Sequence, residues 1–185
     1  MSPIHNQNGG ALIVSLVMLL VMTVIGVAAM QTTSLEEKMA GNARDRDLAF
    51  QAAETALRAG ETWLRTAAQA IPSGEVPCIG TTASGLDATG CYASDVSQIP
   101  AWKSIDNQNF WDDPAWATSY PNTLAQIRTN PSYIVERLQF MDDARSGGLE
   151  AGRPPLQSYY YRITAHGTGG TTDAVAIVQS TYKTN

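Results

Sequence analysis

The side chains in this sequence that could do chemistry are two cysteines, two histidines and two pairs of aspartates. Cys78 and Cys91 are the only cysteines. Two cysteines cannot complete a four-ligand zinc site without histidine, and His5 and His166 lie on or beyond other predicted elements. A disulfide that closes the loop between the cysteines would stabilise a domain by about 3 kcal/mol in the chain-entropy model. The spacing therefore favours a disulfide, with two unpaired buried cysteines as the alternative.

The other candidates fit no enzyme motif. His166 ends a predicted strand, and the sequence has no Gly-x-Ser-x-Gly elbow that would supply a nucleophile. It also has no HExxH motif, and the glycine-rich residues 167–170 precede a strand and not the helix that a phosphate-binding loop needs. The aspartate pairs at 112–113 and 142–143 lack the alternating ligands and central glycine of a calcium loop, so we interpret them as solvated turns. We expect no catalytic residue, no metal site, no cofactor and no enzyme.

Charge is distributed unevenly along the chain. The 185 residues carry 12 basic and 17 acidic side chains, a net charge of −5, which argues against a nucleic-acid partner. Residues 1–35 contain no Asp, Glu, Lys or Arg. The apolar content of 44% is that of a folded chain, and the part after residue 70 is large enough for one core.

Residues 11–30 form an apolar run in which only Ser15 and Thr23 have polar side chains. Twenty helical residues rise about 30 Å, which is the thickness of the hydrocarbon layer of a bilayer. A cleavable secretory signal would have a basic start and a shorter apolar run, so the pattern favours a permanent membrane span over residues 10–30.

The orientation of this span follows from two arguments that disagree. Lys38, Arg44 and Arg46 follow the span and none precedes it, so the positive-inside rule would hold the C-terminal domain in the cytoplasm. Long domains translocate largely regardless of charge, and cysteines favour an oxidising compartment. We therefore expect the C-terminal domain on the oxidising side of the membrane.

Residues 31–70 continue the helix as an amphipathic segment without proline. Apolar side chains recur at steps of three and four, which predicts a helix packed through one face. The stripe comprises Leu35, Met39, Ala43, Phe50, Ala53, Leu57 and Leu64. We expect it to pack on other helices, with a soluble domain covering part of it. Gly26 and Gly41 are candidates either for a bend or for a tight helix contact.

Residues 71–185 predict a domain with one disulfide loop and an antiparallel sheet. The aromatic-rich residues 101–122 could anchor a loop through their rings or form a binding surface. Three runs rich in Tyr, Val, Ile and Thr predict strands at 132–140, 158–166 and 173–182, the last two joined at 167–170. We expect this sheet to pack on the distal half of the helix, an α+β fold.

Five segments of the sequence carry a resemblance to a known family: residues 9–14 (GGALIV), 35–42 (LEEKMAGN), 47–54 (DLAFQAAE), 131–138 (PSYIVERL) and 161–169 (YRITAHGTG). They resemble the type IV pilins, and most closely the PilX-like minor pilins of the type IV pilus machinery. The resemblance implies the type IV pilin fold, in which a long N-terminal helix, transmembrane and then amphipathic, packs against a C-terminal antiparallel sheet.

The resemblance also implies processing of the N-terminus. A prepilin peptidase would remove the leader 1–9 by a cut after Gly9 and methylate the new terminus at Gly10, with a cut after Gly10 as the close alternative. The leader lacks the basic residue usual in this class. The glutamate that pilins commonly carry at mature position five is replaced by Val14.

The function implied is that of a tip-proximal minor pilin that helps initiate pilus assembly. The expected partners are other minor pilins, the major pilin, a PilY-type tip adhesin and the prepilin peptidase. The protein would lie in the inner membrane with a periplasmic C-terminal domain and then enter the pilus. Two alternatives stay open: a minor pseudopilin of type II secretion, and a signal-anchored periplasmic module that binds a ligand through the Trp-rich loop.

Overall fold

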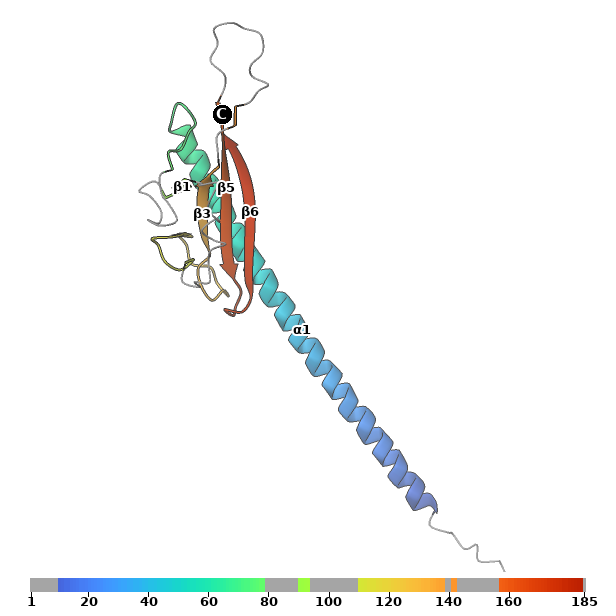
Figure 1. The fold of residues 1–185 in the computed structure, drawn as a ribbon. Coiled ribbons are helices and arrows are strands. Elements are labelled where there is room, and N and C mark those ends of the chain that lie inside the picture. Colours follow the sequence, from blue (N-terminus) through green and yellow to red (C-terminus); the bar gives the residue numbers. More distant parts are fainter. Residues whose placement is uncertain (1–9, 79–89, 94–109, 139–140, 143–156, 185) are drawn as a thin grey trace, which may run out of the picture. The chain divides into compact units, whose positions relative to one another are not determined.

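The computed structural model describes residues 10–78, 90–93, 110–138, 141–142 and 157–184 (Figure 1). Its elements are α1 (Gly10–Gln69), β1 (Tyr92–Ala93), β2 (Thr118–Ser119), β3 (Ser132–Arg137), β4 (Met141–Asp142), β5 (Gln157–Thr168) and β6 (Val175–Thr184). The chain divides into two compact units, Met1–Ala43 and Arg44–Asn185. Each unit is described by itself.

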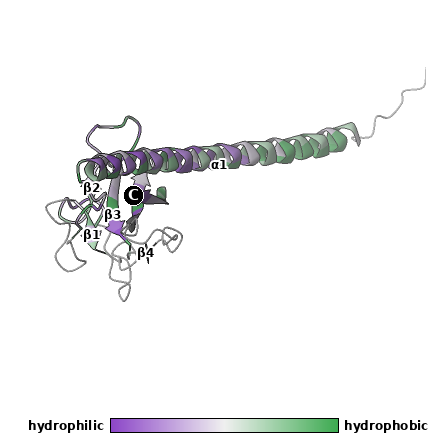
Figure 2. Cartoon of the chain, turned by 90° about the horizontal axis from the view of Figure 1, so that it is seen from above, coloured by the Kyte–Doolittle hydropathy of each residue, from purple (hydrophilic) through white to green (hydrophobic). Residues whose placement is uncertain are grey.

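The described part of the first unit is helical throughout, and its residues are all exposed. Figure 2 shows the apolar colouring of this part of α1. It contains the one described helix segment that is long and apolar enough to cross a membrane. Ser15 and Thr23 donate their hydroxyl protons to the carbonyls of Leu12 and Leu20, at 2.9 and 2.8 Å, so their polar groups are satisfied inside the helix.

Gly26 and Gly41 do not interrupt the helix. The helix runs through Gly26 and Gly41, and a Cβ atom added at either would meet no atom within 4 Å. Neither a helix break nor a tight contact inside this chain therefore explains them.

The second unit contains one mixed sheet. β3, β5 and β6 pair antiparallel, with Ile134 opposite Thr164 and Ala165 opposite Val178. The short β2 and β4 pair antiparallel with β3 and β5. The three predicted strands are antiparallel as expected, but β1, which the sequence did not predict, pairs parallel with β3, so the sheet is mixed. A two-residue strand such as β1 has no pattern of its own in the sequence and exists only through its partner.

The three predicted strands are confirmed as β3, β5 and β6, with ends that differ by a few residues. The turn between β5 and β6 starts after Thr168, so Gly167 belongs to the strand and not to the turn. Asp142 lies in β4 opposite Gln157, which corrects its interpretation as part of a solvated turn. β5 is longer than β3, and its first residues pair with β4 beyond the end of β3.

One face of the sheet packs on the part of α1 that belongs to this unit, as predicted for an α+β fold. The buried helix residues are small or aliphatic: Ala49, Ala52, Ala53, Ala56, Leu57, Gly60 and Leu64. They meet the buried sheet residues Tyr133, Val135, Tyr161, Ile163 and Ala165. The apolar stripe of the helix and the alternating residues of the strands thus bury each other.

A smaller aromatic cluster covers the opposite face of the sheet at β3. Its buried members are Tyr92, Phe110, Trp111, Ala117 and Ile134, with Trp116 packed beside them. Ile134 is completely buried although it points away from the helix. β3 is therefore covered on both faces.

Candidate functional site

Cys78 and Cys91 form a disulfide with a Cα to Cα distance of 5.2 Å. Both cysteines are buried in the core between helix and sheet. The predicted pairing is confirmed, and the described residues contain no free cysteine. The bond ties the segment that follows α1 to the start of β1.

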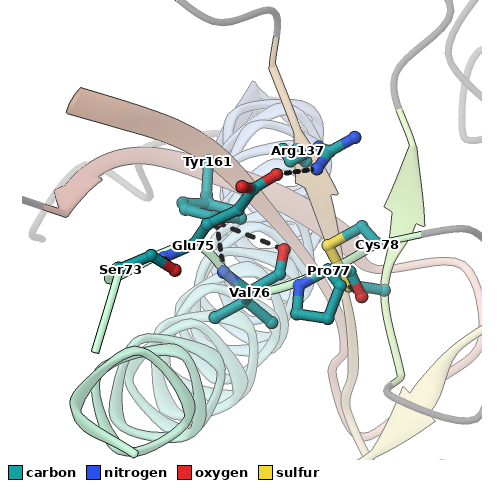
Figure 3. Close-up of polar contacts among 8 residues, drawn as sticks. Ser73, Glu75, Val76, Pro77, Cys78, Arg137 and Tyr161 are labelled. Carbon is teal, nitrogen blue, oxygen red and sulfur yellow. Dashed lines mark hydrogen bonds and ion pairs between the residues drawn. A yellow bond between two sulfur atoms is a disulfide. The ribbon is translucent and has the colours of Figure 1, made fainter. Parts of the chain in front are cut away.

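The residues just before Cys78 are held by the sheet, as Figure 3 shows. The hydroxyl of Tyr161 accepts the N–H of Val76 at 2.7 Å and donates to the carbonyl of Val76 at 3.3 Å. Burial raises the pKa of Tyr161, so the hydroxyl keeps the proton that it donates. Glu75 forms an ion pair with Arg137 at the end of β3. The segment that follows the C-terminal end of α1 is therefore fixed against the sheet.

Asp45 fixes the other end of the packed helix. Its carboxylate accepts the N–H groups of Gly170 and Thr171 and the hydroxyl of Thr171 in the turn between β5 and β6. The hydrogen bond from the Thr171 side chain, followed by smaller effects that include both N–H groups, holds the pKa of Asp45 below its ordinary value of 3.8. Nothing in the local sequence indicated this contact, because its partners lie more than a hundred residues away.

His166 and Trp111 stack with ring centroids 5.1 Å apart and planes 7° from parallel. Burial lowers the pKa of His166, opposed by the charge of Asp112, so the ring is neutral when it packs. Phe110 and Trp111 are also buried, which settles the open question for these two residues in favour of rings that anchor a loop. Trp102 lies outside the described residues.

Tyr92 completes this cluster from β1. Its hydroxyl donates to the carbonyl of Trp116 at 2.6 Å, and burial raises its pKa, with further contributions from Glu136 and Asp113. Arg162 donates to Glu136 at 2.8 Å on the same face of the sheet. No group of three or more potential metal ligands occurs among the residues that the structure describes.

The predicted helix stripe divides into two parts. Ala53, Leu57 and Leu64 are buried against the chain's own sheet, so they form the part of the stripe that the soluble domain covers, as expected, and they do not pack on other helices. Successive helix residues are rotated by about 100° around the helix axis. The predicted stripe lies to one side of the row of buried residues that faces the sheet and overlaps it only in part. The members that stay exposed are Leu35, Met39, Ala43 and Phe50.

The predicted processing site lies at the start of the described chain. Gly9 is outside the described residues, and Gly10 is the first residue of α1. Val14 is 60% exposed one turn later, and the first turn of the helix contains no acidic residue. The chain therefore offers a helix N-terminus without any carboxylate beside it.

Two family models cover the chain. The model described as PilX N-terminal matches residues 8–58, and the model described as type IV pilus assembly protein PilX, C-terminal, matches residues 51–184. Comparisons with curated proteins and with solved structures returned no significant match. The second model alone spans most of the chain, and together they include the apolar helix, the packed helix and the sheet. This chain therefore belongs to the PilX family of type IV pilus assembly proteins, and it is a PilX-like minor pilin.

Proposed function

We propose that this chain is a tip-proximal minor pilin that helps initiate type IV pilus assembly in a complex with other minor pilins. In this proposal, prepilin peptidase removes the leader 1–9 and methylates Gly10. Residues 10–30 then hold the protein in the inner membrane, with the C-terminal domain in the periplasm. From there the helix passes into the pilus, close to its tip.

The observation that carries the proposal is Val14 in place of the glutamate at mature position five. After a cut before Gly10, a terminal amine would sit at the N-terminus of a helix, where the helix dipole already disfavours positive charge. Inside an apolar bundle this amine is costly unless a carboxylate pairs with it. Pilins are thought to provide that carboxylate to the neighbouring subunit. A subunit with Val14 cannot do so, which suits a place with no subunit ahead of it.

The exposed side chains of α1 supply the surface for assembly. Leu35, Met39 and Phe50 are 59%, 62% and 52% exposed, although apolar side chains of this size gain by burial. Other minor pilins and the major pilin would cover them through their own helices, and a PilY-type adhesin would meet the head domain. Membership of a family of type IV pilus assembly proteins supports a pilus role over type II secretion. Burial of Phe110 and Trp111 leaves those rings unable to serve as a binding platform.

The substitution Val14→Glu tests the proposal, with Val14→Gln as its matched control. Glu adds a carboxylate that has no amine to pair with at the tip, whereas Gln has the same shape without the charge. Pilus number per cell and recovery of minor pilins with the tagged chain are the measurements. We expect Val14→Glu to lower both by about tenfold, as a buried unpaired charge predicts, and Val14→Gln to lower them less. Normal pili and normal partners with Val14→Glu would remove the basis for a tip position.

A further inference from the structure

Among the described residues, β6 is an edge strand of the sheet, and its own sequence has little of the usual protection of an edge. It pairs with β5 in unbroken register from Thr184 opposite Tyr159 to Val175 opposite Thr168, and no other described strand pairs with it (Figure 1). Proteins protect exposed edges with proline, bulges, charges or a covering segment. The strand VAIVQSTYKT has no proline and no bulge, and its one charged residue, Lys183, lies near its end.

The direction of the free backbone groups follows from the hydrogen bonds. The N–H of Gly169 donates to the carbonyl of Ala174 at 2.8 Å, which fixes the phase of the ladder between β5 and β6. Hydrogen-bonded and non-bonded pairs alternate in an antiparallel ladder. Even-numbered residues of β6 therefore bond to β5, and odd-numbered residues point their N–H and C=O groups away from the sheet. We name the first four of these odd-numbered residues the outward row: Val175, Ile177, Gln179 and Thr181.

The side chains of the outward row are exposed on the face of the sheet opposite the helix. Val175 and Ile177 are 50% and 45% exposed. Ile177 lies in register beside His166, whose ring is covered by Trp111. The other side chains of β6 face the helix, as the hydrogen bond from Ser180 to Glu61 at 2.7 Å shows. The edge thus offers free backbone groups together with an apolar pair of side chains.

The exposed residue Phe50 lies on the same flank of α1 as Glu61, the residue that contacts β6. Phe50, Leu57 and Glu61 follow the helical spacing of seven and four residues and share one flank of α1. Glu61 on this flank contacts β6 through Ser180. Phe50 is 52% exposed, so this flank of α1 carries exposed apolar surface as well.

We propose that the outward row of β6 binds an extended strand supplied by another protein of the pilus machinery. A row of alternating N–H and C=O groups at strand spacing is satisfied by the backbone of a further strand, and the exposed Val175 and Ile177 select apolar residues on one face of it. The inference rests on the proposed function in one respect, because that function places pilus proteins beside this chain.

A second copy of this chain does not fit the edge. Antiparallel pairing of β6 with β6 reverses the direction of the second helix. Arg44 is about 25 Å along α1 from Glu61, the residue level with Ser180, so the two Arg44 residues would lie about 50 Å apart. Under the proposed function both chains enter one membrane, and the 13 residues 31–43 of each chain have a length of only about 20 Å as helix. Two copies could also pair parallel about a two-fold axis that runs along the strands. Val175 and Ile177 of one copy would then lie on the opposite face of the joined sheet from Val175 and Ile177 of the other copy.

The experiment compares Ile177→Pro with Ile177→Thr in the full chain, made in its native cells. Both variants lose the Ile side chain, but only proline removes an N–H group, and that group points away from β5. A benzoylphenylalanine at position 181 provides photo-crosslinking, and mass spectrometry identifies the peptide attached. We expect a strand of another pilus protein in the unsubstituted chain and with Ile177→Thr, and about tenfold less adduct with Ile177→Pro.

Adducts of equal yield in the two variants, adducts with a second copy, or no adduct would each overturn the proposal. A second measurement does not depend on the fold of the proline variant. Hydrogen exchange of the unsubstituted chain, alone and in the assembled complex, should show new protection at positions 177, 179 and 181 and not at 176, 178 and 180. Failure of the proposed function looks different: cells without the chain would then make pili normally, whatever happens at β6.

Discussion

Gly167 of β5 lies directly against the backbone of α1 at Ala53. A Cβ atom added to Gly167 would come within 2.4 Å of the Ala53 nitrogen and 2.5 Å of the Ala49 carbonyl oxygen. The described glycines with positive φ are Gly74 and Gly90, so Gly167 is required for space and not for its backbone conformation. The absence of one side chain sets how closely the sheet approaches the helix.

Gly167→Ala should therefore destabilise the head domain by about 3 kcal/mol, because a backbone contact cannot be relieved by a rotamer change. Gly60→Ala is the comparison variant, and we expect it to destabilise the head domain less than Gly167→Ala does. Its Cβ would meet the side chains of Ile163 and Tyr133 at 2.8 and 2.9 Å, and alanine gains about 1 kcal/mol of helix propensity over glycine. Urea unfolding of the purified protein measures both. Equal losses for the two variants would contradict the steric explanation.

Local patterns predicted the long elements of this fold because those elements carry their signal in their own residues. The helix over Gly10–Gln69 has apolar residues at helical spacing and no proline, and β3, β5 and β6 are rich in β-branched and aromatic residues. β1, β2 and β4 have two residues each and form only because a long strand is available to pair with them. Their existence, and the parallel pair at β1, could not be derived from local sequence.

The candidate site was predictable where chemistry is carried by residue type. Two cysteines with no further ligands indicated a disulfide, and the structure has it. The contact of Asp45 with Thr171 joins residues 126 positions apart, so no local signal announces it. For a similar reason, the sequence did not show which residues of the predicted helix stripe the sheet would cover. Phe50 is exposed and Ala53 is buried, and only the position of the sheet shows which flank is covered.

Asp45→Asn should change how stability depends on pH. The pKa of Asp45 is lowered in the folded state, chiefly by the hydrogen bond from Thr171, so its contribution is present above the unfolded pKa of about 3.8. The contribution is lost as the pH falls below 3.8 through the folded pKa. The urea midpoint of the unsubstituted protein should therefore exceed that of Asp45→Asn at pH 7, with the difference vanishing in strong acid.

Asp47→Asn is the matched control, because it removes the same charge from the same region of the helix. Asp47 is exposed, so Asp47→Asn should leave the urea midpoint at pH 7 close to that of the unsubstituted protein. A difference between Asp45→Asn and the unsubstituted protein that stays constant from pH 7 down to pH 2 would mean that the ionised carboxylate is not what holds the turn between β5 and β6.

Loss of the disulfide should cost about 3 kcal/mol, as expected for a loop with a sequence separation of 13. The variant Cys78→Ala/Cys91→Ala avoids leaving polar atoms at two buried positions. Reduction of the unsubstituted protein with dithiothreitol should lower the free energy of unfolding by a similar amount. A loss with the double variant but none on reduction would assign the effect to packing instead of the crosslink.

The mature protein should begin at Gly10 and carry one methyl group on its terminal amine. The resemblance of GGALIV to the start of a pilin helix implies this, and a start at Ala11 is the close alternative. Intact mass and N-terminal peptide analysis of protein from native membranes distinguish these two starts. A chain that keeps Met1, or one that begins near Ala29, would show that the helix is not processed as a pilin helix.

Phe50→Ser should separate assembly from folding. Phe50 is exposed on the packed part of α1, so its loss should change the free energy of unfolding by less than about 0.5 kcal/mol. Leu64→Ala, at a completely buried position of the same predicted stripe, should cost about 3 kcal/mol. Pilus number and recovery of other minor pilins should fall with Phe50→Ser and stay normal with Gln51→Ser, an exposed neighbour that points about 100° away around the helix. Normal assembly with Phe50→Ser would mean that this flank of the helix faces solvent in the pilus, and that the partners of this minor pilin contact it elsewhere.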